Sequence, residues 1–157
     1  MKQLIVVALA IVFGSQAAPY RAEIEKARAA RVAELEADDG WLTVTGLLWL
    51  KPGRNVAGSA PGSDIALPAK APKRLGVFEL TGGKVTFTAE PGVTVTSEGA
   101  PVRQTTLDPR GGDKAALAIG DLRMFLIRRE DRYAVRMRDM NSPMRRGFKG
   151  LTYYPLN

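Results

Sequence analysis

Apolar and polar residues follow three different patterns along this chain, and each pattern predicts a different kind of segment. Residues 4–13 form an unbroken apolar run. Residues 19–37 carry apolar side chains at helical spacing, whereas from residue 41 onward apolar and polar residues alternate in short stretches. Alternation of this kind is typical of strands with one buried face. Most of the chain is therefore predicted to be β-structure.

The segment 19–37 is predicted to form one helix, the main part of an N-terminal unit over residues 18–40. Proline is favoured in the first turn of a helix, and Pro19 stands there. The apolar side of this helix is narrow and partly alanine, which indicates a helix that lies on another surface rather than in a core. Gly40 is predicted to end the helix in the left-handed conformation.

Residues 41–157 are predicted to form a β-sandwich. Two hairpins are the clearest signals, over residues 76–89 and 122–139, and the first turns at Gly82 and Gly83. Shorter strands are predicted over residues 41–45, 46–50, 65–67, 93–96, 102–107 and 116–119. Many short strands between turns rich in glycine and proline are typical of an all-β sandwich or barrel. The predicted fold class is mainly β, with one N-terminal helix after a leader.

The leader is the segment 1–17, which contains the apolar run. Lys2 precedes the run, and small residues at Ser15 and Ala17 follow it. This is the pattern of a secretory signal peptide, expected to be cut after Ala17. The run is about half the length that a spanning helix needs, although an uncleaved membrane anchor remains the alternative. With no cysteine to carry a lipid, the product is expected to be periplasmic or secreted and not a lipoprotein.

The composition removes most familiar catalytic chemistry. The chain has no histidine and no cysteine, so the standard nucleophilic triads and ordinary zinc or copper sites are excluded. No glycine-rich phosphate loop occurs, and neither a cofactor nor a metal is expected. Paired carboxylates are the catalytic option that remains, with Asp64, Asp121, Asp131 and Asp139 as candidates. No catalytic residue is assigned, and the sequence favours a protein that is not an enzyme.

Positive charge gathers in the last part of a chain whose formal net charge is +7. From Asp121 to the end there are nine basic and four acidic residues. A basic surface attracts an anionic ligand, anionic lipid or nucleic acid. Nucleic acid is not expected as a partner, because the leader predicts export from the cytoplasm. The alternative is a solvated basic face of a sheet.

The richest polar cluster is Arg136, Arg138 and Asp139. On a strand, Arg136 and Arg138 share one face, and Met137 takes the other. Two arginines on one face can bind a carboxylate or phosphate, and Asp139 can hold a neighbouring arginine through two hydrogen bonds. Two interpretations stay open: a ligand-binding site, or an internal brace for a loop over residues 141–147.

Two long motifs resemble a known family. The run GWLTVTGLLWLKPGRNVAGSAPGSDIALP, residues 40–68, resembles the opening of the bacterial domain of unknown function 1684 family. The run DRYAVRMRDMNSPMRRGFKGLTYYP, residues 131–155, resembles a later segment of that family. The motif positions carried over are Trp41, Gly46, Trp49, Gly58, Asp64, Pro68, Phe148, Gly150, Tyr153 and Pro155.

The resemblance implies little chemistry, because the family has no established activity. Its members continue well beyond this point, so the chain is expected to be the first half of a member, a fragment or a short form. The missing C-terminal half is then a possible partner. The expected function is that of an extracytoplasmic, non-catalytic β-rich module. Half of a small-anion-binding or hydrolase-like site, completed by the missing half, is the alternative.

The order of loops and strands also resembles a forkhead-associated β-sandwich. Readers of phosphothreonine with that fold have an arginine after their first glycine and a Ser-x-x-His motif. Here Ser59 follows Gly58, and the chain has no histidine. The resemblance therefore implies the fold without the phosphopeptide function.

Overall fold

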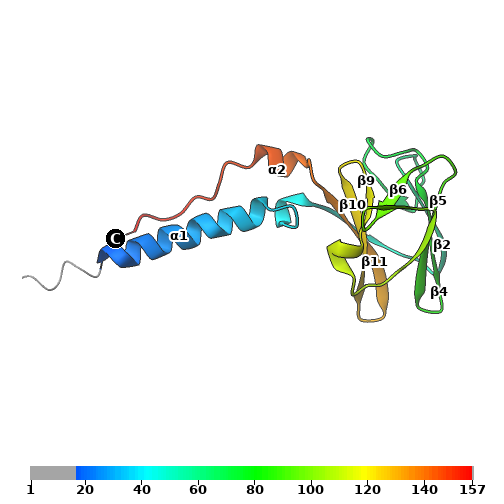
Figure 1. The fold of residues 1–157 in the computed structure, drawn as a ribbon, viewed down its shortest axis with the longest axis horizontal. Coiled ribbons are helices and arrows are strands. Elements are labelled where there is room, and N and C mark those ends of the chain that lie inside the picture. The colour runs from blue at the N-terminus through cyan, green and yellow to red at the C-terminus, as the bar shows by residue number, and fades with distance from the viewer. Residues whose placement is uncertain (1–16, 157) are drawn as a thin grey trace, which may run out of the picture.

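The computed structural model describes residues 17–156, which form a sandwich of two sheets with a long projection (Figure 1). The apolar run of the predicted leader lies outside the described residues. The helices are α1 (Ala17–Glu36), η1 (Trp41–Thr43), η2 (Gly112–Ala115) and α2 (Pro143–Gly147). The strands are β1 (Val44–Trp49), β2 (Gly53–Gly58), β3 (Ile65–Ala66), β4 (Gly76–Thr81), β5 (Lys84–Ala89), β6 (Val95–Ser97), β7 (Ala100–Val102), β8 (Gln104–Leu107), β9 (Leu117–Ile119), β10 (Leu122–Arg129) and β11 (Arg132–Asp139).

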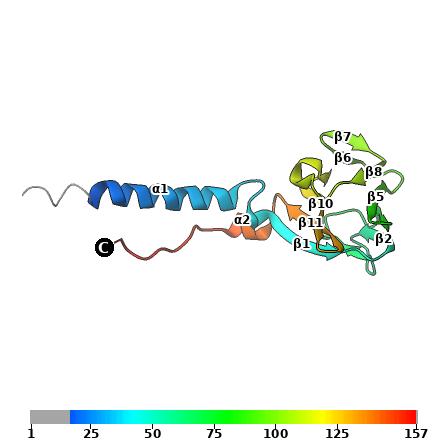
Figure 2. The same cartoon turned by 90° about the horizontal axis from the view of Figure 1, so that it is seen from below.

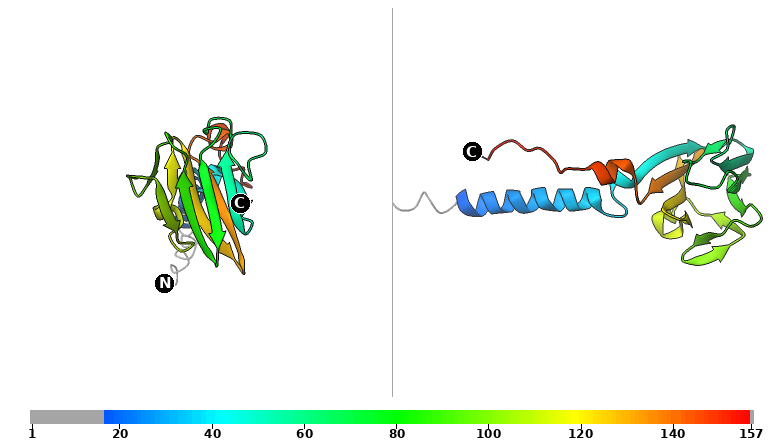
Figure 3. Two further views of the ribbon diagram at one scale, coloured as in Figure 1. Left: turned by 90° about the vertical axis from the view of Figure 1, so that its right-hand side faces the viewer. Right: turned by 90° about the horizontal axis from the view of Figure 1, so that it is seen from above.

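The strands form two sheets that face each other (Figure 3). One has six strands in the order β1-β11-β10-β9-β6-β7, and the other has five in the order β3-β2-β4-β5-β8. Neighbouring strands are antiparallel, except that β2 and β3 are parallel. The predicted fold class, a mainly β sandwich with one N-terminal helix, is confirmed.

A single apolar core fills the space between the two sheets. Phe78 and Phe87 from the five-stranded sheet are fully buried, and their ring centroids lie 4.9 Å apart. Leu126 and Val135 from the six-stranded sheet belong to the same cluster. Both sheets thus bury one face against the other, as the alternating sequence pattern predicts.

The two predicted hairpins are confirmed, whereas the strand predicted over residues 102–107 is wrong. That stretch is divided between two strands, because β7 belongs to the six-stranded sheet and β8 to the five-stranded sheet. Arg103 stands at the crossing, and its carbonyl accepts a hydrogen bond from the Ala89 amide at 2.8 Å. Residues 102–107 contain no glycine or proline, so the sequence pattern runs through the crossing at Arg103 without a break.

Three local predictions near the ends of the sandwich are also corrected. Residues 41–43 form a 3-10 helix rather than a strand, and the predicted loop over 141–147 contains α2. Gly40 has φ −71° and is not left-handed. It is glycine for another reason: a Cβ there would lie 2.3 Å from the Leu35 carbonyl oxygen.

Two predicted motif positions, Gly58 and Asp64, stabilise the loops that follow β1. A Cβ on Gly58 would lie 2.1 Å from the Lys73 carbonyl oxygen, so the two backbones meet where no other residue fits. The Asp64 carboxylate accepts from the Val56 amide at 2.9 Å and from the Lys51 ammonium at 3.1 Å. These donors hold the pKa of Asp64 below its usual value. Asp64 therefore closes a loop.

The projection, here called the arm, consists of α1 and residues 148–156. Figures 1 and 2 show α1 extending away from the sandwich, with the C-terminal segment running back beside it. A helix of 20 residues is about 30 Å long. Its half-buried residues are Ile24, Arg28, Val32 and Leu35, and they form one stripe. The C-terminal segment contacts this predicted thin face at Arg28.

Two arginines of α1 fasten the C-terminal segment. The Arg28 guanidinium donates to the Tyr154 carbonyl at 2.8 Å and lies 4.5 Å from the centroid of the Tyr153 ring. The Arg21 guanidinium donates to the Leu156 carbonyl at 3.2 Å. Within residues 17–156, no helix is both long and apolar enough to cross a membrane.

Candidate functional site

The predicted cluster on β11 is divided between the two faces of the six-stranded sheet. Arg136 and Arg138 point away from the core, while Met137 points into it, as the alternation predicts. Asp139 falls on the inner side, opposite Leu122 in the register. Only the two arginines therefore share a surface.

Arg138 is buried, with 8% of its surface exposed, and is held by three acceptors. Its Nε donates to Asp113 Oδ1 at 2.9 Å. Its Nη1 donates to the Gly40 carbonyl oxygen at 2.8 Å and to Thr43 Oγ1 at 2.9 Å. The guanidinium thus joins β11 to η2 and to the junction between α1 and the sandwich, which is the geometry of an internal brace.

Asp139 has a different partner from the one predicted. Its carboxylate accepts from the Lys70 ammonium and from the Asn141 amide, and no arginine pairs with it among residues 17–156. Lys70 also lies 3.6 Å from the Asp121 carboxylate. Two candidate carboxylates, Asp121 and Asp139, therefore meet on one ammonium. The lysine thus joins the two carboxylates in one ion-pair cluster.

Residues that sequence reasoning did not single out complete the junction with the arm. Ser142 Oγ accepts from the Arg145 amide at 3.0 Å, which caps α2, and donates to the Leu42 carbonyl. The Arg145 guanidinium donates to Asp38 at 2.8 Å and to the Met140 carbonyl at 3.0 Å. A serine followed by proline is a common helix start, so the pattern Ser142-Pro143 was the available signal.

A pocket of about 240 Å³ opens beside the brace, but its charges do not suit an anion. It is lined by Asp38, Asp39, Asp113, Arg123, Arg138 and Met140. Three carboxylates surround two guanidinium groups there, and Arg138 already has its acceptors. Asp38 pairs with Arg145 and Asp113 with Arg138, so the cation of Arg138 is already engaged, and Asp39 adds a further negative charge that repels an anion. Of the three predicted ligand-binding residues, Arg136 is the one whose surroundings favour an external anion.

Arg136 belongs to a larger surface on the outer side of the six-stranded sheet. Register pairs place Arg136 between Leu47 and Phe125, and Ala134 between Trp49 and Ile127. Paired residues in neighbouring strands point to the same side, so one continuous surface results. We call it the arginine–tryptophan face, and its members are Trp41, Leu47, Trp49, Phe125, Ile127, Arg129, Arg132 and Arg136.

Three apolar members of this face are open to solvent, whereas Phe125 is buried and Ile127 is half-buried. Trp41 is 62% exposed, Leu47 41% and Trp49 38%. Both tryptophans of the chain are among them. Large apolar side chains grouped on one surface and interleaved with charge are typical of an interaction site rather than of an ordinary solvated face.

Two arginines of this face lie near its tryptophan rings, and three of its arginines lack carboxylate partners among the described residues. The Arg132 guanidinium lies 4.0 Å from the Trp49 ring centroid, and that of Arg136 lies 5.8 Å from the Trp41 ring centroid. Among the described residues, no carboxylate lies within 4.0 Å of the cations of Arg129, Arg132 or Arg136. The Nε of Arg136 is buried without a hydrogen-bond acceptor in the same part of the chain. The positive charge is therefore uncompensated.

The other motif positions have structural places. Gly46 faces Met137, whose methyl carbon would lie 3.1 Å from a Cβ there. Gly150 has φ +92°, and Phe148 donates its amide to the Arg145 carbonyl at the end of α2. The Pro68 carbonyl accepts from the Ala71 amide at 2.8 Å, whereas Pro155 is exposed on the arm. Only Trp41 and Trp49 of the carried-over positions reach the arginine–tryptophan face.

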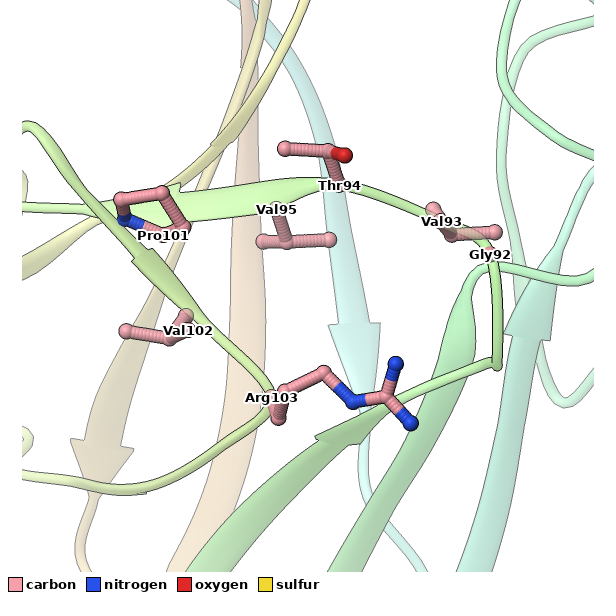
Figure 4. A pocket seen from close by; sticks show the side chains of 7 residues that line it. All are labelled: Gly92, Val93, Thr94, Val95, Pro101, Val102 and Arg103. Carbon is pink, nitrogen blue, oxygen red and sulfur yellow. The ribbon is translucent and has the colours of Figure 1, made fainter.

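A second hollow opens where the chain crosses between the sheets (Figure 4). Its volume is about 200 Å³, and Val93, Val95, Val102 and Pro101 supply most of its lining. Arg103 adds one cation at its side. It contains no carboxylate and no nucleophile besides the Thr94 hydroxyl. Within residues 17–156, no group of three or more acidic residues is placed to hold a metal ion.

Comparison with known proteins gives matches in fold alone. No protein-family model and no curated protein matches this chain. A crystal structure of the FhaA FHA domain, complexed with the intracellular domain of Rv3910, is similar at a TM-score of 0.41 and 16% identity. That match covers 59% of this chain and 97% of that one. A domain from work on phosphothreonine-dependent FHA domain interactions is similar at a TM-score of 0.41 and 18% identity. That match covers 61% of this chain and 95% of that one. Phosphothreonine dependence is a property of that protein.

Proposed function

We propose that this protein is an extracytoplasmic, non-catalytic binding module that holds an anionic partner on the arginine–tryptophan face. One observation carries the proposal: Arg129, Arg132 and Arg136 lack carboxylate partners and lie among exposed tryptophans. Guanidinium groups bind carboxylates and phosphates through paired donors, and tryptophan adds apolar contact area around them. An anionic partner would supply the acceptors that this chain does not.

The location and the family belong to the same proposal. The leader pattern over residues 1–17 supports export, and the two long motifs support membership of the domain of unknown function 1684 family. Export has a direct test in the mass of the protein recovered from the periplasm or medium. A product that begins at Ala18 supports it, and a product that keeps Lys2 contradicts it.

Binding is tested with poly-L-glutamate as a defined soluble polyanion. Because both tryptophans lie on the proposed surface, their intrinsic fluorescence reports contact directly. Titration should change the emission, and the change should weaken as salt is raised. A triple variant, Arg129→Gln with Arg132→Gln and Arg136→Gln, should lose most of the affinity.

The matched control removes three cations from elsewhere on the sandwich. Arg54, Lys84 and Arg103 are exposed, and each can be changed to glutamine with the same loss of net charge. If the control variant loses as much affinity as the triple variant, binding follows net charge, and the assignment of the face is wrong. If the tryptophan emission of the unaltered protein responds neither to poly-L-glutamate nor to anionic vesicles, the proposed function is wrong.

A further inference from the structure

The arginine–tryptophan face is open, and two physical features limit what can cover it. Its uncompensated cations require a partner that carries negative charge. Its exposed apolar groups, Trp41, Leu47 and Trp49, require a partner that also accepts apolar surface. The partner must offer negative charge and apolar surface side by side, because the Arg132 guanidinium lies 4.0 Å from the Trp49 ring centroid and that of Arg136 lies 5.8 Å from the Trp41 ring centroid.

A second copy of this chain does not meet the first requirement. A symmetric dimer through this surface would bring the same patch of both copies together. Arg129, Arg132 and Arg136 of both copies would then lie in one interface, and the members of the face include no carboxylate. Like charges brought together in an interface are repulsive.

We propose that the arginine–tryptophan face docks on the anionic phospholipid headgroups of a membrane surface. The inference rests on the proposed function and names the partner of the same site. A bilayer interface presents phosphates and the edge of the apolar region within one thin layer. Tryptophan is favoured at that level, and arginine extends its charged end to phosphate while its stem covers apolar surface.

The distribution of charge fits a broad anionic surface. The formal net charge of the chain is +7. The exposed Arg129 and Arg132 lie at the end of the β10–β11 hairpin. Glu130 and Asp131 form the turn of that hairpin and oppose attraction there. The contact therefore centres on the strands, around Trp49, Arg132 and Arg136, rather than on the turn itself.

Vesicles provide the test, and the full chain is used throughout. Vesicles of phosphatidylglycerol mixed with phosphatidylcholine should bind the protein, shift its tryptophan emission to shorter wavelength and, when their acyl chains are brominated, quench that emission. Pure phosphatidylcholine vesicles should bind far less. The triple variant of Arg129, Arg132 and Arg136 should partition about 100-fold more weakly, since each cation near an anionic surface contributes about five-fold.

Two controls keep the result interpretable. The variant of Arg54, Lys84 and Arg103 has the same net charge and the same leader residues, and should partition within about five-fold of the unaltered protein. The double variant of Arg129 and Arg132 changes only exposed side chains. It should lose about 25-fold, so the test does not depend on the half-buried Arg136 tolerating substitution.

The possible results separate the two proposals. Vesicle binding without tryptophan quenching places the contact elsewhere and overturns the inference. Binding to poly-L-glutamate but not to anionic vesicles also overturns it, while the proposed function stands. Binding to neither probe removes both. Concentration-dependent dimerisation that shifts the tryptophan emission without lipid makes the second copy the occupant and overturns the membrane partner.

Discussion

The sandwich and the arm are held by different kinds of contact. Inside the sandwich, Phe78, Phe87 and Leu126 are buried by both sheets and need no polar partner. In the arm, no side chain of residues 19–36 is completely buried, and Arg21 and Arg28 hold the two segments together through hydrogen bonds to backbone carbonyls. The comparison teaches that the sandwich has its own core, whereas the arm depends on a few polar contacts and on its junction.

The largest effect is expected in the core of the sandwich. Phe87→Ala removes a fully buried ring that packs on Phe78, and it should lower the free energy of unfolding by about 3–5 kcal/mol. Urea denaturation followed by far-ultraviolet circular dichroism measures it. Tyr154→Ala is the matched control, because Tyr154 is 91% exposed on the arm, and it should leave the midpoint unchanged. Equal effects of the two changes would break the distinction between the regions.

A smaller effect is expected at the junction, where Arg138 joins the two regions. Arg138→Met keeps the stem but leaves Asp113, Thr43 and the Gly40 carbonyl without their donor. It should lower the free energy of unfolding by about 2–4 kcal/mol, since Asp113 is partly exposed and regains water. Urea denaturation again gives the value. A variant as stable as the unaltered protein would show that the brace does not contribute.

The brace also separates the two original interpretations of the β11 cluster. If Arg138 acts only as a brace, Arg138→Met should keep its affinity for poly-L-glutamate at temperatures where it is folded. Arg136→Gln should show the opposite pattern, with affinity reduced and stability nearly unchanged. If the folded Arg138 variant loses affinity for poly-L-glutamate, Arg138 takes part in binding and the interpretation as a brace alone is wrong.

The sequence predicted what depends on local pattern. Alternation placed Arg136 and Arg138 on one side of β11 and Met137 on the other, and Gly82 with Gly83 marked the β4–β5 turn. These features are local because a strand's period and a turn's backbone geometry involve few residues. The fold class follows from repeating such signals along the chain.

What the sequence did not predict depends on distant partners. Asp139 meets Lys70 across 69 positions, and Arg138 meets Asp113 across 25. Nothing in the local pattern selects these pairs, because they arise when separate loops meet at one end of the sandwich. The arginine–tryptophan face was missed for the same reason: Trp49 and Arg132 become neighbours only through the pairing of β1 with β11.

The smallest effect is expected in the arm, and it tests whether the two regions are independent. Arg28→Ala removes the hydrogen bond to the Tyr154 carbonyl and the cation over the Tyr153 ring, each a partly exposed contact of modest strength. Limited proteolysis should cut residues 148–156 faster, while amide hydrogen exchange in β4 and β5 stays unchanged. Arg31→Ala is the control on the same helix, because Arg31 pairs with Glu34. If exchange in β4 rises along with cleavage of the arm, the arm helps to hold the core, and the two regions form one cooperative unit.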